Sequence, residues 1–282
     1  MKTILLPFQN DDIAVCALET AHFIANRYNS HIEGLFVLPQ PQIIAGEGIA
    51  LPGVYLTQMA EDGRKLADAA HERFTHYVNS HDIPLKDLRE SSVTPSASWQ
   101  EMEGLESQII GERGRLFDMV VIGRTTKYYA GDWNIICEAA LFESGRLVLI
   151  APQSRPSTVG ENVLIVWNCS TECARTVSMS MDILRDAKEI TIATTLGALV
   201  PGPSGEDMAD HLRRHGLKIK THNIGSDSQA AAGTSALEYA REISADLMIK
   251  SAYTHTRLRQ MIFGGATREI LSNATIPVLM AH

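Results

Sequence analysis

The sequence has little of several features that define whole classes of protein. Only 6% of its 282 residues are aromatic, and its 25 basic residues are outnumbered by 33 acidic ones. The resulting formal charge of −8 argues against a surface for nucleic acid or for an anionic membrane, since both attract an excess of Lys and Arg. We therefore expect neither of these partners, and a small ligand or a protein partner fits better.

Long apolar runs and cysteines are scarce as well. No run approaches the ~20 residues of a membrane-spanning helix, and the first apolar stretch turns polar too early for a secretory signal. The four cysteines, Cys16, Cys137, Cys169 and Cys173, are too few and too unevenly spaced for a disulfide framework. We expect a cytoplasmic protein with buried or incidental thiols, the alternative being metal or redox use of Cys169 and Cys173.

The chain repeats one order of apolar segments at an offset of about 130 to 160 residues. Each short apolar run is followed by polar residues and then by a helical pattern, with helices expected at 13–29 and 171–187. The matching runs are 2–8 with 162–167, 31–38 with 189–196, 118–123 with 246–251, and 145–152 with 275–282. Each copy reads as five strands alternating with four helices, and the matching runs supply four of the five strands.

Alternation of strand and helix predicts a mostly parallel sheet with helices on both faces. The fold class is α/β, with two tandem Rossmann-like, doubly wound domains at 1–153 and 161–282, each holding a mostly parallel five-stranded sheet. A polar segment with Pro and Gly, 153–161, separates them. The ligand crevice of such a sheet lies at the carboxyl ends of its strands, and the loops at 39–56 and 197–206 are expected to overhang it.

The end of the chain carries a motif with a family resemblance. Residues 264–267, Gly-Gly-Ala-Thr, precede an expected helix, and the apolar run 276–279 follows it. This arrangement resembles the last quarter of a universal stress protein domain, a HUP-type fold whose nucleotide loop is written G-x2-G-x9-G-[ST]. The spacing is intact, but Ser251 and Thr254 stand at the two leading glycine positions.

The resemblance covers the whole chain as two tandem copies. In the family an acidic residue after the first strand faces the adenosine, and Asn168 and Gln9 occupy that place in the second and first halves. In the first half Gly123 stands at the first glycine position and Thr126 occupies the second, but no later pair matches, because Asn134 and Ile135 stand there. The resemblance thus implies a degenerate loop in domain 1 and a partly retained one in domain 2.

The implied ligand is ATP or a related nucleotide, with Mg²⁺ as an accompanying ion. Glycines in a phosphate loop bring backbone N–H groups close to the anion, and the following helix adds its positive end; Ser and Thr restrict φ but offer hydroxyl donors. The candidate ligand-binding residues are Asn168, Ser251, Thr254, Arg257, Gly264, Gly265, Ala266 and Thr267, with Gln9, Gly123 and Thr126 in the first half.

No catalytic residue or metal ligand is predicted. The chain has no Walker A motif and no G-x-G-x-x-G. His71 and His76 are five residues apart and cannot converge on one helix face, while His211 and His215 fit a surface helix end.

Three functions remain open at this stage. They are a nucleotide-binding stress or regulatory protein, a ligand-free interaction module of the same fold, and a slow ATPase. A slow ATPase would need an acidic Mg²⁺ ligand near the loop, and the sequence offers none there, since Asp246 begins its strand and points away from the crevice.

Assembly follows from the last strand of each half, an apolar sheet edge that needs a partner. In universal stress proteins, the resemblance implies, this strand pairs across a dimer interface. The two halves are expected to satisfy each other as an intramolecular pseudo-dimer, and a further homodimer of whole chains stays open.

Overall fold

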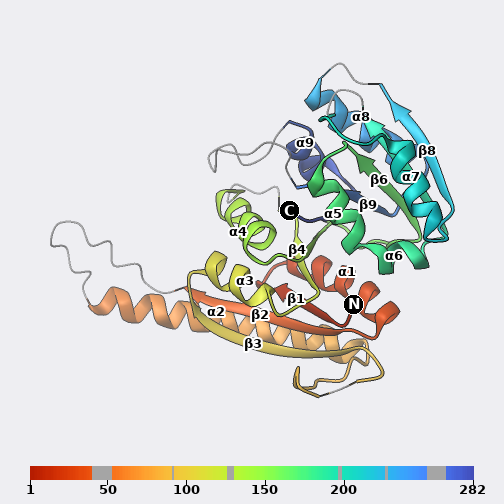
Figure 1. Ribbon diagram of the computed structural model, residues 1–282. Coiled ribbons are helices and arrows are strands. Elements are labelled where there is room, and N and C mark those ends of the chain that lie inside the picture. The colour runs from red at the N-terminus through yellow and green to blue at the C-terminus, as the bar shows by residue number, and fades with distance from the viewer. Residues whose placement is uncertain (40–52, 91, 126–129, 196–198, 226–227, 253–264) are drawn as a thin grey trace.

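The computed structural model describes residues 1–39, 53–90, 92–125, 130–195, 199–225, 228–252 and 265–282 (Figure 1). The first half contains β1 (Thr3–Pro7), α1 (Asp12–Tyr28), β2 (His31–Pro39), α2 (Gly53–Ser80), β3 (Ser96–Gly104), α3 (Glu106–Gly114), β4 (Met119–Gly123), α4 (Ala130–Glu143) and β5 (Leu147–Ala151). The second half contains β6 (Asn162–Trp167), α5 (Thr171–Met179), α6 (Met181–Asp186), β7 (Glu189–Thr195), α7 (Gly205–Arg214), β8 (Ile219–Ile224), α8 (Gln229–Glu242), β9 (Leu247–Lys250), α9 (Gly265–Asn273) and β10 (Val278–Met280). The predicted alternation of strand and helix is confirmed.

The strands form one ten-stranded sheet in the order β3-β2-β1-β4-β5-β10-β9-β6-β7-β8. Each half contributes five neighbouring strands that pair in parallel, so the doubly wound fold class is confirmed. The halves meet where β5 and β10 pair antiparallel, with Leu149 opposite Leu279 at the centre. Because these two leucines hold equivalent places in the repeat, the junction has an approximate twofold axis.

The core fills both faces of this sheet, as the continuous apolar runs predict. Strand residues such as Leu5, Val120, Leu164 and Ile249 are fully buried, although their side chains point to alternate faces. Both hydrophobic clusters contain residues from both halves, so burial continues across the junction.

In each half, an aspartate accepts hydrogen bonds from the backbone at the start of the first strand. Asp118 accepts hydrogen bonds from the backbone N–H groups of Lys2 and Thr3, and Asp246 accepts them from Glu161 and Asn162. Asp246 therefore lies at the amino edge of the sheet, away from the crevice, and its carboxylate has a structural use.

Two expectations about local structure were wrong. The helix expected at 171–187 is interrupted at Ser180, whose hydroxyl donates to the carbonyl of Thr176 at 2.6 Å and so competes with the helical ladder. The loop expected at 39–56 includes residues 53–56, which already belong to α2, while 40–52 lie outside the described residues. No helix in the described part of the chain is long and apolar enough to cross a membrane.

Candidate functional site

The candidate site lies at the carboxyl edge of the second half, where β6 and β9 are neighbours. From β6 the chain continues to β7 and β8 on one side, and it then crosses to β9 and β10 on the other side. Strand order therefore reverses between β6 and β9, and the crevice of a doubly wound sheet opens at that point. Asn168 follows β6, Lys250 ends β9 and Ser251 follows it, and α9 begins at Gly265.

Asn168 has an internal structural role at the end of β6. Its Oδ1 accepts hydrogen bonds from the hydroxyl of Ser170 at 2.8 Å and from the backbone N–H of the same residue at 3.3 Å. Ser170 in turn caps α5, because its Oγ accepts from the N–H of Cys173. At the position where the resemblance places an acidic residue, the side-chain oxygen is thus engaged in an N-terminal cap.

Lys250 was not predicted as a site residue, yet its ammonium joins two residues that were. The side chain is 6% exposed, and Nζ donates to the backbone carbonyl of Ser251 at 2.6 Å and to Oγ1 of Thr267 at 2.9 Å. Thr267 is the third residue of α9, so a buried cation lies beside the first turn of this helix. The signal in the sequence was a lysine ending an apolar strand where the first half has Ile122.

The surroundings of Lys250 are low in polarity. Burial lowers its pKa to about 8, and the neighbouring thiol of Cys173 acts weakly in the opposite direction. Burial also raises the pKa of Cys173 to about 12, so this thiol stays protonated and offers no counter-charge. Among the described residues no carboxylate forms an ion pair with Lys250.

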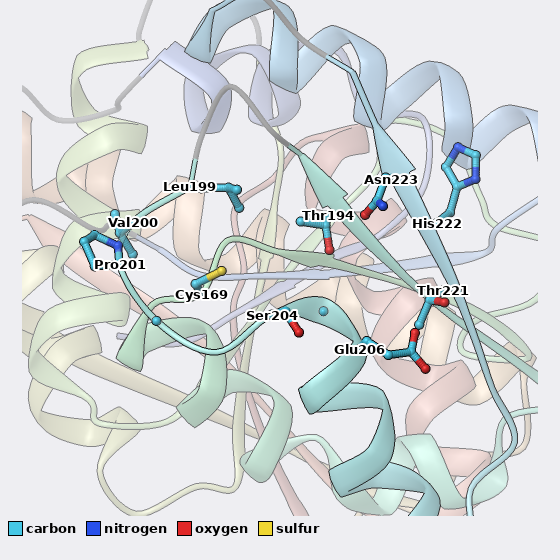
Figure 2. A pocket seen from close by; sticks show the side chains of 12 residues that line it. Cys169, Thr194, Leu199, Val200, Pro201, Ser204, Glu206, Thr221, His222 and Asn223 are labelled. Carbon is cyan, nitrogen blue, oxygen red and sulfur yellow. The ribbon is translucent and has the colours of Figure 1, made fainter.

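A cavity of about 590 Å³ lies at the carboxyl ends of β7 and β8 and is also lined by Cys169, the residue after Asn168 (Figure 2). Polar groups come from Thr194, Thr221, Asn223 and the start of α7, and apolar groups come from the loop at 199–201. The ring of His222 stacks on Tyr239 of α8 and so turns away from the cavity. Hydrogen bonds from Arg213 and Thr221 lower the pKa of Glu206, and its carboxylate at the rim is paired with Arg213 at 2.6 Å.

The loop at 199–204 closes one wall of the cavity against the end of β6. The N–H of Val200 donates to the carbonyl of Asn168 at 3.1 Å, and a Cβ on Gly202 would lie 2.3 Å from the carbonyl oxygen of Cys169. Only glycine permits this approach. The expectation that this loop overhangs the crevice is confirmed for its described residues.

The equivalent edge of the first half is differently used. Gln9 donates from Nε2 to the carboxylate of Glu106 at 2.9 Å, and the carbonyl of Gly123 accepts a hydrogen bond from the indole of Trp133 at 2.7 Å. A Cβ on Gly123 would lie 2.8 Å from the carbonyl oxygen of Ile13, so this glycine serves close packing of α1 on β4. Arg124, which follows β4, is buried and turned toward α9.

The structure brings together only some of the predicted ligand-binding residues. Ser251 and Thr267 meet through Lys250, and Gly265 and Ala266 form the start of α9. Gln9 and Gly123 belong to the other half. The predicted residues Thr254, Arg257, Gly264 and Thr126 lie outside the described residues.

The described part of the chain contains no cluster of side chains that indicates metal binding or thiol chemistry. No group of three or more His, Cys, Asp or Glu side chains there could hold a metal ion. His71 stacks on Trp99, and His211 and His215 meet edge to face at the end of α7. The cysteines are free thiols, and Cys173 is fully buried.

Comparison with known proteins gives similarity over the full length. No family model matches the chain. A universal stress protein of Synechocystis sp. is 22% identical over 300 residues, which cover 99% of each chain. The structure superposes on a universal stress protein from Archaeoglobus fulgidus with a TM-score of 0.70 and 15% identity, covering 99% of this chain and 95% of that one. A functionally unknown protein from Pseudomonas aeruginosa PAO1 gives a TM-score of 0.52 at 15% identity, covering 100% and 92%.

Proposed function

We propose that this chain is a cytoplasmic, non-catalytic stress-response regulator that binds ATP or a related nucleotide in its second half. The premise is that it belongs to the universal stress protein family, by its full-length match and its tandem fold. The first half serves mainly as structure.

The observation that carries the proposal is the buried ammonium of Lys250 beside the first turn of α9. The N-terminal end of a helix already has a partial positive charge, so a cation placed there is unfavourable unless an anion balances both. A phosphate group is such an anion, and it also accepts hydrogen bonds from the free N–H groups of the helix. The charge at this position supports phosphate binding despite the missing glycines.

The adjoining cavity supports a direction for the ligand. Its volume of about 590 Å³ suits a small molecule, and hydroxyl, amide and apolar groups line it. Glu206 at the rim is paired with Arg213 at 2.6 Å, and the described residues that line the cavity include no Lys or Arg to bind a phosphate. We therefore orient the nucleoside toward β7 and β8 and the phosphates toward Lys250. Mg²⁺ would then be held by phosphate oxygens and water, because the described residues of the site provide no carboxylate cluster.

A ligand-free interaction module is the second candidate, and one observation favours it. Oδ1 of Asn168, Nζ of Lys250 and Oγ1 of Thr267 already have partners within the protein. A nucleotide must therefore bind beside satisfied polar groups. Hydrolysis is the least supported activity, because Asp246 lies at the opposite edge of the sheet and bonds two backbone N–H groups there.

Replacement of Lys250 by isoleucine tests the proposal, because Ile122 fills the equivalent position in the first half. ATP with Mg²⁺ at a hundred times its Kd should stabilise the parent protein by about 2.7 kcal/mol, which raises Tm by roughly 5 °C or more. Lys250→Ile should lose this shift, while its unliganded Tm stays equal or rises, since an apolar residue replaces a buried charge.

The control is Lys188→Met, which removes an exposed lysine at the amino edge of the same half and should leave the ATP shift intact. Small molecules released by denaturing the purified protein are identified in parallel by mass spectrometry. If the parent releases no nucleotide and gains no stability at millimolar ATP, the interaction module is the correct function. If Lys250→Ile keeps the full shift, nucleotide binds elsewhere.

A further inference from the structure

Arg124 is a buried cation at the junction of the two halves. The residue follows β4, is 4% exposed, and donates from Nη1 to the backbone carbonyl of Leu271 at 3.3 Å. Leu271 lies in the last turn of α9, in the other half of the chain. Among the described residues, Nε of Arg124 has no hydrogen-bond partner and no carboxylate pairs with its guanidinium.

The contact is favourable because of the helix end that it meets. The last four carbonyl groups of a helix have no partner within it, and that end has a partial negative charge. A guanidinium placed there both donates a hydrogen bond and balances this charge. Arg124, a residue of the first half, thus stabilises the C-terminal end of α9, a helix of the second half.

The contact has no counterpart across the twofold axis. The backbone N–H of Arg124 donates to the carbonyl of Ala151, and Ala252 makes the equivalent bond to Ala281, each at 3.2 Å. The two positions therefore match, but alanine cannot reach α4 as arginine reaches α9. Only the first half therefore makes this contact with the other half.

Two buried cations from different halves thus contact α9, one near each end. Lys250 of the second half bonds Thr267 near its start, and Arg124 of the first half bonds Leu271 near its end. We propose that Arg124 is an interdomain tie that couples the local opening of α9 to the end of β4 in the first half. This coupling does not depend on a bound nucleotide.

Hydrogen exchange of the full-length, unliganded chain, followed by mass spectrometry, tests the tie through Arg124→Met. Methionine keeps the unbranched stem of the side chain but removes the guanidinium, and with it the charge and the donors. We expect the amides of 265–273 to exchange about tenfold faster or more, as loss of a charged hydrogen bond implies. The amides of α8, which packs beside α9, should keep their rate.

A matched control is Arg115→Met, because Arg115 donates from Nε to the carbonyl of Glu143 at the end of α4 within the first half. It should leave α9 unchanged. Arg124→Lys, which keeps the charge and one donor, should accelerate α9 only a few-fold, and it serves as the test if the methionine variant does not fold. Unchanged exchange in α9, or equal acceleration of α8 and α9, would overturn the proposal.

Discussion

Lys250 shows what burial does to a single charge in this protein. Its pKa falls from 10.5 to about 8, because desolvation disfavours the ammonium. The unfolded chain holds this proton up to about pH 10.5 and the folded chain releases it near pH 8. The unfolded state therefore binds more protons between these values, and stability rises with pH across this window.

We expect Lys250 to add on the order of 3 kcal/mol to the unfolding free energy between about pH 8 and pH 10.5. Urea denaturation of the parent and of Lys250→Met at several pH values across the window measures the difference, since other titrating groups are common to both. The parent curve should be the steeper one. Parallel curves would mean that the ammonium is hydrated in the folded protein.

The conformation of the loop at 199–204 depends on the small size of Gly202. Gly202 lies against the carbonyl of Cys169, and Val200 bonds Asn168, so the loop and the end of β6 hold one another in place. The N-terminal cap of α7 fixes the other end, where Ser204 and Asp207 bond reciprocally as a capping box. The wall of the cavity is therefore well defined.

Gly202→Ala should lower the unfolding free energy by about 1 to 3 kcal/mol, because the added methyl group forces the loop away from β6. Thermal denaturation measures the loss, and hydrogen exchange of 199–204 locates it. Gly225→Ala is the control, since a Cβ there meets no atom within 4 Å. Equal Tm values for the two variants would show that the loop moves without cost.

The whole molecule should lose stability in mild acid. Burial lowers the pKa of His31, whose ring nitrogens bond Ser96 and Ser98, and burial together with nearby His81 lowers the pKa of His22. The folded state therefore takes up protons less readily than the unfolded state below about pH 6.5, and stability falls as pH decreases through that range.

Urea unfolding at about pH 7.5 and pH 5.5 measures this loss. The denaturation midpoint should move to lower urea in the parent, and by a smaller amount in His31→Gln. The control is His76→Gln, which changes an exposed histidine of α2 and should keep the full parental shift. A midpoint that does not depend on pH would contradict the prediction.

The fold was readable from the sequence because most strands are short apolar runs and the order of these runs occurs twice. The two edge strands, β3 and β8, are mostly polar, and no apolar run marks them. The site was readable only in part. Lys250 ends a strand whose four residues are all buried, so its burial could have been foreseen from the continuous apolar run. The bond from Arg124 to Leu271 spans 147 residues, and no local pattern encodes a partner at that separation. The break at Ser180 depends on one hydroxyl that helix periodicity does not represent.

The antiparallel pairing of β5 and β10 has a kinetic and thermodynamic consequence. Two separate chains would form such a pair in a bimolecular step, and their stability would fall on dilution. Here both strands belong to one polypeptide, so the step is intramolecular and its effective concentration is set by the connecting chain. The ten-stranded sheet should consequently survive at dilutions where an equivalent pair of single-domain chains would dissociate.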